Sequence, residues 1–248
     1  MLISWLLLLK FNSILTISNY ITYLTEIIPL IFCITFFKKI YTNTLKVFFI
    51  YAITSVIFVT VSLLSLSYYD SFFLYMSSVR IFLVLEFILI CFFYKTIFKS
   101  ARIKKLLTVL PIIFILFCLY NFLKSSKTEF DFAPLVIECL FFTVVILYYF
   151  YERIMYNFTI PLYQLPSFWI SVAFLIYFSG NFFLFLFSKV IENDPGFANQ
   201  YTLIYSSITI IKNILLCTAL IVNRNLIVTK DISSVIPNLS IENFETVQ

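Results

Sequence analysis

The sequence predicts an all-α integral membrane protein, a single bundle of seven transmembrane helices with its N-terminus outside and its C-terminus in the cytoplasm. Hydrophobic residues make up 62% of the 248-residue chain, charged residues only 12%, and the mean hydropathy is +1.03. Soluble globular chains are about half apolar and about a quarter charged. The apolar residues also gather into runs of about 20, the length that crosses a bilayer as a helix.

Seven apolar runs, separated by charged and turn residues, mark the expected helices. Each run is long enough to cross about 30 Å of hydrocarbon at about 1.5 Å per residue. Pro134 suits the first turn of the fifth helix, and Ser167, directly after Pro166, suits the N-cap of the sixth. The expected helices cover residues 19–37, 47–67, 73–94, 106–123, 133–151, 168–188 and 203–224.

These runs imply one domain, a seven-helix transmembrane domain over residues 1–226, followed by a short cytoplasmic tail over residues 227–248. The connections are too short to hold a catalytic or ligand-binding domain outside the membrane. Residues 1–18 are expected to form a short interfacial segment, because Lys10 interrupts an apolar run that is already short. The alternative is that they form an eighth span.

The predicted orientation follows from the distribution of lysine and arginine, which concentrate in cytoplasmic loops. One set of loops and the tail hold most of them, and the opposite loops hold few. The basic side carries Lys38, Lys39, Lys46, Lys95, Lys99, Arg102, Lys104, Lys105, Arg153, Arg224 and Lys230, and the other side Lys10, Lys124, Lys127 and Lys189. The basic side is therefore predicted to be cytoplasmic, in the inner membrane of a bacterium.

Several functional classes are disfavoured by the residues that the chain lacks. It has no histidine, and its five cysteines lie inside apolar segments without a CxxC spacing, so we expect neither a disulfide framework nor a metal site. The net charge of +5 is explained by basic loops and does not indicate nucleic-acid binding. No nucleophile elbow or phosphate-binding loop is present, so we expect no enzyme and no cofactor.

The candidate functional residues are polar side chains within the predicted spans, where charge is costly and usually functional. By depth along the helices, these residues fall in the predicted outer half of the bilayer or near its middle. We predict that they form a polar cluster between helices. The candidate residues are Glu26, Arg80, Glu86, Glu138, Asn181, Lys212 and Asn213.

Within this cluster, Glu86 and Lys212 are predicted to be the central pair, with Glu26, Arg80 and Glu138 as balancing charges. Arg80 and Glu86 lie six residues apart, about 120° around one helix, so neither can be the other's partner. Three explanations remain open. The cluster forms an outward-facing pocket for a ligand or signal, it fastens the helices together, or it carries protons or ions as in a small transporter.

Three segments carry a resemblance to a known group: SVRIFLVLEFILICFFY, FWISVAFLIYFSGNFFLF and IIKNILLCTAL. They resemble uncharacterised seven-span inner-membrane proteins of Bacteroidota, which have a glutamate in the third helix, an FW…YF.G block in the sixth and an asparagine in the seventh. Such proteins often accompany sensor kinases. The resemblance implies a non-enzymatic signalling or accessory role, with the lipid bilayer and a membrane partner such as a sensor kinase around it.

Overall fold

The computed structural model describes residues 13–36, 42–67, 72–124, 132–155, 161–187 and 195–235. This described part of the chain folds into seven long α-helices and one 3-10 turn, η2 (Leu162–Gln164). The helices are α2 (Ser13–Thr35), α3 (Asn43–Ser67), α4 (Phe72–Ile97), α5 (Ala101–Lys124), α6 (Phe132–Met155), α7 (Pro166–Leu186) and α9 (Pro195–Val235).

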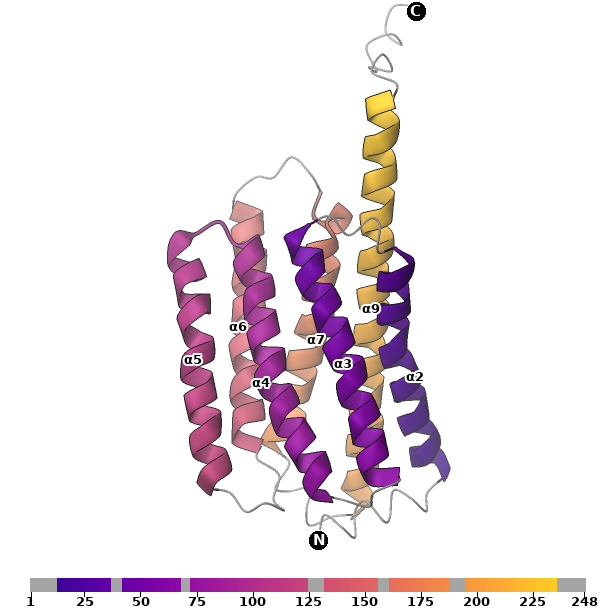
Figure 1. The fold of residues 1–248 in the computed structure, drawn as a ribbon, viewed down its shortest axis with the longest axis vertical. Coiled ribbons are helices and arrows are strands. Elements are labelled where there is room, and N and C mark those ends of the chain that lie inside the picture. Colours follow the sequence, from indigo (N-terminus) through magenta and orange to yellow (C-terminus); the bar gives the residue numbers. More distant parts are fainter. Residues whose placement is uncertain are drawn as a thin grey trace, which may run out of the picture.

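The helices run alternately up and down in one bundle (Figure 1). In that view α5, α4, α3 and α2 form the front row, and α6, α7 and α9 stand behind them. Most helices pack against their neighbours in sequence, and α9 returns to pack against α2, whereas α5 and α6 make little contact. The arrangement brings the first and last described helices together, which places residues that are far apart in the sequence side by side.

Within the described part of the chain, six helices are long and apolar enough to cross a membrane: α3, α4, α5, α6, α7 and α9. Helix α2 contributes a shorter apolar stretch, Tyr20–Thr35. The chain is therefore a helical, multi-pass membrane protein. The predicted interfacial segment or eighth span at residues 1–18 falls partly outside the described residues, and its part from Ser13 onward belongs to α2.

Several helix ends differ from the prediction, since α2 begins at Ser13, α5 at Ala101 and α9 at Pro195, each five to eight residues before the predicted start. Ser167 is not the cap of α7, because the helix begins at Pro166 with Leu165 at the N-cap, and proline is favoured at the first helical position. Helix α9 does not stop near residue 224 but continues to Val235, through the predicted start of the tail at residue 227. In Figure 1 this end of α9 extends well beyond the other helices.

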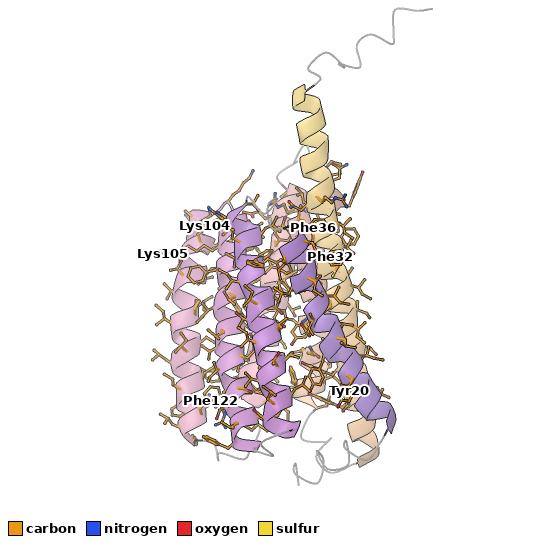
Figure 2. The ribbon with its side chains drawn as sticks, turned by 45° about the vertical axis from the view of Figure 1, so that its right-hand side comes forward. Tyr20, Phe32, Phe36, Lys104, Lys105 and Phe122 are labelled. Carbon is orange, nitrogen blue, oxygen red and sulfur yellow. The ribbon has the colours of Figure 1, made fainter. Side chains whose placement is uncertain are left out.

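The two ends of the bundle differ in the residues that they carry. Figure 2 places Lys104 and Lys105 of α5 at the same end of the bundle as Phe36, which directly follows α2. Tyr20 and Phe122 lie toward the opposite end. The end with these lysines is the predicted cytoplasmic side, and which end faces the cytoplasm stays a prediction.

Aromatic rings form much of the core between the helices. Phe87 of α4 stacks on Phe114 of α5 at a centroid distance of 3.9 Å and also lies 5.0 Å from Phe142 of α6. Phe142 in turn lies 4.9 Å from Phe178 of α7. Isoleucine and leucine side chains occupy the outer faces, where many are exposed, as suits contact with lipid tails.

Helices α7 and α9 approach closely at Gly180. A Cβ atom added there would lie 2.7 Å from Cδ1 and 3.2 Å from Cγ1 of Ile208. We expect Gly180→Val to lower the free energy of unfolding by about 1–3 kcal/mol, because overpacking forces the helices apart or Ile208 off its rotamer. Unfolding by SDS titration in detergent micelles measures the change.

Two further variants make the Gly180→Val experiment specific. Adding Ile208→Ala should recover most of the loss, because it removes the atoms that a valine side chain would meet. Phe183→Val, on the exposed face of the same helix, should have a small effect. The close contact would be contradicted if the double variant lost as much stability as Gly180→Val alone.

Candidate functional site

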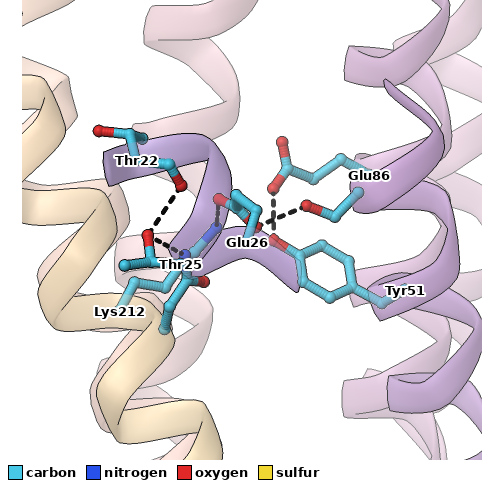
Figure 3. Close-up of polar contacts among 8 residues, drawn as sticks. Thr22, Thr25, Glu26, Tyr51, Glu86 and Lys212 are labelled. Carbon is cyan, nitrogen blue, oxygen red and sulfur yellow. Dashed lines mark hydrogen bonds and ion pairs between the residues drawn. The ribbon is translucent and has the colours of Figure 1, made fainter. Parts of the chain in front are cut away.

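The centre of the site is an ion pair between the first and last described helices. The ammonium of Lys212, on α9, donates a hydrogen bond to Oε1 of Glu26, on α2, at 2.7 Å. The hydroxyl of Ser55, on α3, donates to Oε2 of the same carboxylate at 2.8 Å. Both oxygens of Glu26 are therefore engaged, and three helices meet at this carboxylate (Figure 3).

A second carboxylate, Glu86 of α4, stands beside this pair. Tyr51 of α3 donates its hydroxyl to Oε1 of Glu86 at 3.1 Å. Glu86 also lies close enough to Lys212 and Glu26 for their charges to interact. We predicted Glu86 and Lys212 as the central pair, but the ion pair of Lys212 is with Glu26. We call Glu26, Tyr51, Ser55, Glu86 and Lys212 the central polar cluster.

The ammonium of Lys212 has an aromatic neighbour as well. It lies 4.7 Å from the ring centroid of Tyr177, on α7. A cation over an aromatic face is stabilised by the negative charge of that face, and more strongly when it is desolvated. The lysine is thus held by α2 through charge and by α7 through a ring.

Asn213, next to Lys212, extends the contact between α9 and α2. Its Nδ2 donates to the hydroxyl of Thr25 at 3.4 Å, and that hydroxyl donates to the carbonyl of Thr22 at 2.8 Å (Figure 3). Its Oδ1 is buried and has no hydrogen-bond partner among the described residues. Asn213 therefore has an unused acceptor beside the ion pair.

Glu138 of α6 and Asn181 of α7 are buried at 1% and 0% exposure. The carboxyl of Glu138 lies close enough to Glu86 for the two charges to interact. Within the part of the chain that the structure describes, Oε1 of Glu138 and both side-chain polar atoms of Asn181 have no hydrogen-bond partner. Such atoms are rare in native proteins, since each unsatisfied buried group costs about 1–3 kcal/mol.

Arg80 has a different neighbour. Its guanidinium lies 5.0 Å from the ring centroid of Phe122, on α5, whereas the central polar cluster draws on α2, α3, α4 and α9. Arg80 is also only half-buried. Of the predicted residues, the structure therefore gathers Glu26, Glu86, Glu138, Lys212 and Asn213 around the junction of the helices, buries Asn181 in the adjacent α7, and turns Arg80 toward Phe122 of α5.

Sequence reasoning missed three kinds of residue in and around the site. Tyr51 and Ser55 are four residues apart and share one face of α3, and this spacing was the available signal. Thr25 is an ordinary helix residue without such a signal. Glu152 is buried in the last turn of α6, where its Oε1 accepts a hydrogen bond from the backbone N–H of Lys99 at 3.3 Å, and it lay one residue beyond the predicted helix end.

The chemistry available to the site is that of charge and hydrogen bonding. Among the described residues, no group of three or more histidine, cysteine, aspartate or glutamate side chains is placed to hold a metal ion. The interior instead offers carboxylates, one ammonium, tyrosine hydroxyls and amide oxygens. This set suits the binding of a small polar or charged species or the movement of protons.

Comparison with known protein families, with curated proteins and with solved structures finds no match to this chain. The resemblance to Bacteroidota membrane proteins stays a prediction.

Proposed function

We propose that this chain is a non-enzymatic signalling or accessory protein of the bacterial cytoplasmic membrane. In this proposal the central polar cluster and its neighbours sense or bind a polar species reaching them from the outside. Helix α9 then conveys the change to the cytoplasmic side, where a membrane partner such as a sensor kinase responds. The basic loops support the inner-membrane orientation through the positive-inside rule.

The continuity of α9 is the observation that carries this proposal. One helix, Pro195–Val235, includes Lys212 and continues beyond the end of the other helices (Figure 1). From Lys212 to Val235 it extends ~35 Å at the rise of an α-helix. A shift of α9 at the cluster is therefore transmitted along a single rigid element.

The ion pair provides an element that can occupy two states. When Lys212 and Glu26 are paired, α9 is tied to α2 by charge. A species that neutralises or displaces either group removes that tie, and the helix is free to adopt another position. Signalling proteins commonly convert such local changes in charge into movement of a packed helix.

Cross-linking at the far end of α2 and α9 tests the proposal. The guanidinium of Arg224 lies 5.6 Å from the ring centroid of Phe36, so cysteines at these two positions, in a background without the native five, should lie within reach of a short bismaleimide cross-linker. We expect Glu26→Gln to lower the rate of this cross-linking in membrane vesicles. The single cysteine at position 224 should react with an impermeant thiol reagent only in inside-out vesicles.

Glu152→Gln is the matched control, since it removes another buried carboxylate away from the central polar cluster. It should leave the cross-linking rate unchanged. A folded Glu26→Gln variant that cross-links as fast as the unsubstituted protein would reject the role of α9. Reaction of position 224 in right-side-out vesicles would reject the orientation.

A small transporter or proton-coupled carrier is the second candidate. The observation that favours it is the buried Oε1 of Glu138, which lies beside Glu86 and has no hydrogen-bond partner in the described ranges, because intramembrane carboxyl groups commonly serve as proton relays. Net flux of a solute or of protons across sealed vesicles containing the purified chain would favour the carrier over the signalling protein.

A further inference from the structure

Three neighbouring helices each bury a side-chain oxygen that lacks a hydrogen-bond partner. These atoms are Oε1 of Glu138, Oδ1 of Asn181 and the hydroxyl of Thr209, and no described residue bonds to them. The three side chains are between 0% and 2% exposed. We call these three residues the acceptor site.

The packing of α6 against α7 brings the first two to the same level. Phe142 lies 4.9 Å from Phe178, and Phe150 lies 5.7 Å from Phe168, so the two helices run antiparallel in a defined register. Glu138 is four residues before Phe142 on α6, and Asn181 is three residues after Phe178 on α7. Because the helices are antiparallel, both residues lie about one turn from the Phe142–Phe178 pair, toward the same end of the bundle. The two buried side chains therefore lie at the same level of the bundle, on helices that pack against each other.

The packing of α7 against α9 adds the third residue. Gly180 approaches Ile208 so closely that a Cβ atom would lie 2.7 Å from it. Tyr177 of α7 lies against Lys212 of α9, which runs antiparallel to it. Asn181 is four residues after Tyr177 and Thr209 is three residues before Lys212, so both lie about one turn further toward the same end of the bundle. The acceptor site thus draws on α6, α7 and α9 at one height in the bundle.

The charges around the acceptor site are unbalanced. Among the described side chains at this junction, Glu26, Glu86 and Glu138 are buried acids and Lys212 is the buried base. Lys212 is engaged by Glu26 at 2.7 Å. This leaves Glu86, which accepts the hydroxyl of Tyr51, and Glu138, whose Oε1 has no partner among the described residues. A buried charge is normally paired, so an added positive charge would be placed at Glu138.

We propose that the acceptor site binds a small monovalent cation, with Glu138 as the charged ligand and Asn181 and Thr209 as neutral oxygen ligands. This inference rests on the proposed function and names the species that the cluster senses. Carboxylate, amide and hydroxyl oxygens are the ligands of hard cations. One unpartnered carboxylate balances one charge, which favours a monovalent ion over a divalent one.

A metal cation and a primary ammonium group share this chemistry, and thermal unfolding of the full chain distinguishes them. Sodium, potassium and methylammonium chlorides are each titrated against choline chloride at constant ionic strength, with the protein in lipid nanodiscs. Binding to the folded state alone raises the Tm with concentration. At about 100 times the Kd we expect a rise of about 5 °C with the cation that fits.

Variants assign the rise in Tm to the acceptor site. Glu138→Gln should abolish it, and Thr209→Val, which keeps the side-chain shape, should weaken it even if Glu138→Gln fails to fold. Glu152→Gln should retain it, since its carboxylate already has the backbone N–H of Lys99 as a partner.

The opposite results overturn the proposal. These are an unchanged Tm with all three cations, or a rise that persists in both Glu138→Gln and Thr209→Val. In that case ordered water satisfies the buried oxygens, as it does in many proteins. A cation-independent Tm together with cross-linking that depends on Glu26 would reject the cation site and leave the proposed function standing.

Discussion

Lys212→Met is expected to lower the free energy of unfolding by about 3–5 kcal/mol, because it leaves a buried carboxylate without its partner. Glu26 loses the hydrogen bond of 2.7 Å and keeps only the one from Ser55, at 2.8 Å. The contact of the ammonium with the ring of Tyr177 is lost as well. SDS titration in detergent micelles, followed by circular dichroism, measures the change.

A second substitution separates the loss of the pair from the loss of the lysine. Replacing both charges, as Lys212→Met with Glu26→Leu, should recover most of the stability, since an apolar pair of similar volume often equals a buried ion pair. Lys124→Met removes an exposed lysine at the end of α5 and should change little. Unfolding of Lys212→Met at the same SDS concentration as the unsubstituted protein would contradict the importance of the pair.

The double variant also bears on what the ion pair is for. If the pair only fastens α2 to α9, a stable apolar replacement should hold the far end of α9 in place, and the Phe36–Arg224 cysteine pair should cross-link normally. If the pair is a switch, the same variant should be stable but locked in one state, so its cross-linking rate should differ from that of the unsubstituted protein, which exchanges between two states. Stability and cross-linking together therefore distinguish fastening, one of the three explanations that the sequence left open, from switching.

The helical fold was predictable because lipid offers the backbone no hydrogen-bond partners. Only segments that satisfy their own N–H and C=O groups can cross a bilayer, so long apolar runs must be helices. The ends were less predictable. Helix α9 continues to Val235 through the polar segment that follows Arg224, where hydropathy falls although the backbone stays helical.

The site was predictable as a set of candidates but not as a set of contacts. Because a charge is costly in lipid, Glu26, Glu86 and Lys212 could be identified as candidates from their residue type and position alone. The choice of Glu26 over Glu86 as the partner of Lys212 depends on α9 packing against α2, which closes the bundle. One sequence gives the depth of each charge but not the order of helices around the bundle.

The uncharged members of the site show the same limit. Tyr51 satisfies Glu86, and Ser55 satisfies Glu26, yet tyrosine and serine are common throughout the chain. Their importance comes from the carboxylates that they face. Arg80 shows the converse, since this charged residue within a span lies over the ring of Phe122, on α5, and is not a member of the central polar cluster.

In medium free of small monovalent cations, Glu138→Leu is expected to raise the free energy of unfolding by about 1–3 kcal/mol. The substitution removes a buried group whose Oε1 has no hydrogen-bond partner in the described part of the chain, and the cost of leaving such a group unsatisfied is of this size. Leucine also fills most of the same volume between α6 and its neighbours. The Tm and the SDS midpoint in choline chloride measure the gain.

Glu152→Leu is the matched control, and it should have the opposite sign. That carboxylate is also buried but accepts a hydrogen bond from the backbone N–H of Lys99, so the substitution removes a hydrogen bond that the folded state makes. Destabilisation by both substitutions would mean that Glu138 has a partner within the folded chain. A gain from Glu138→Leu alone would mean that the protein retains a costly carboxyl group against its own stability, which is the usual mark of a residue kept for binding.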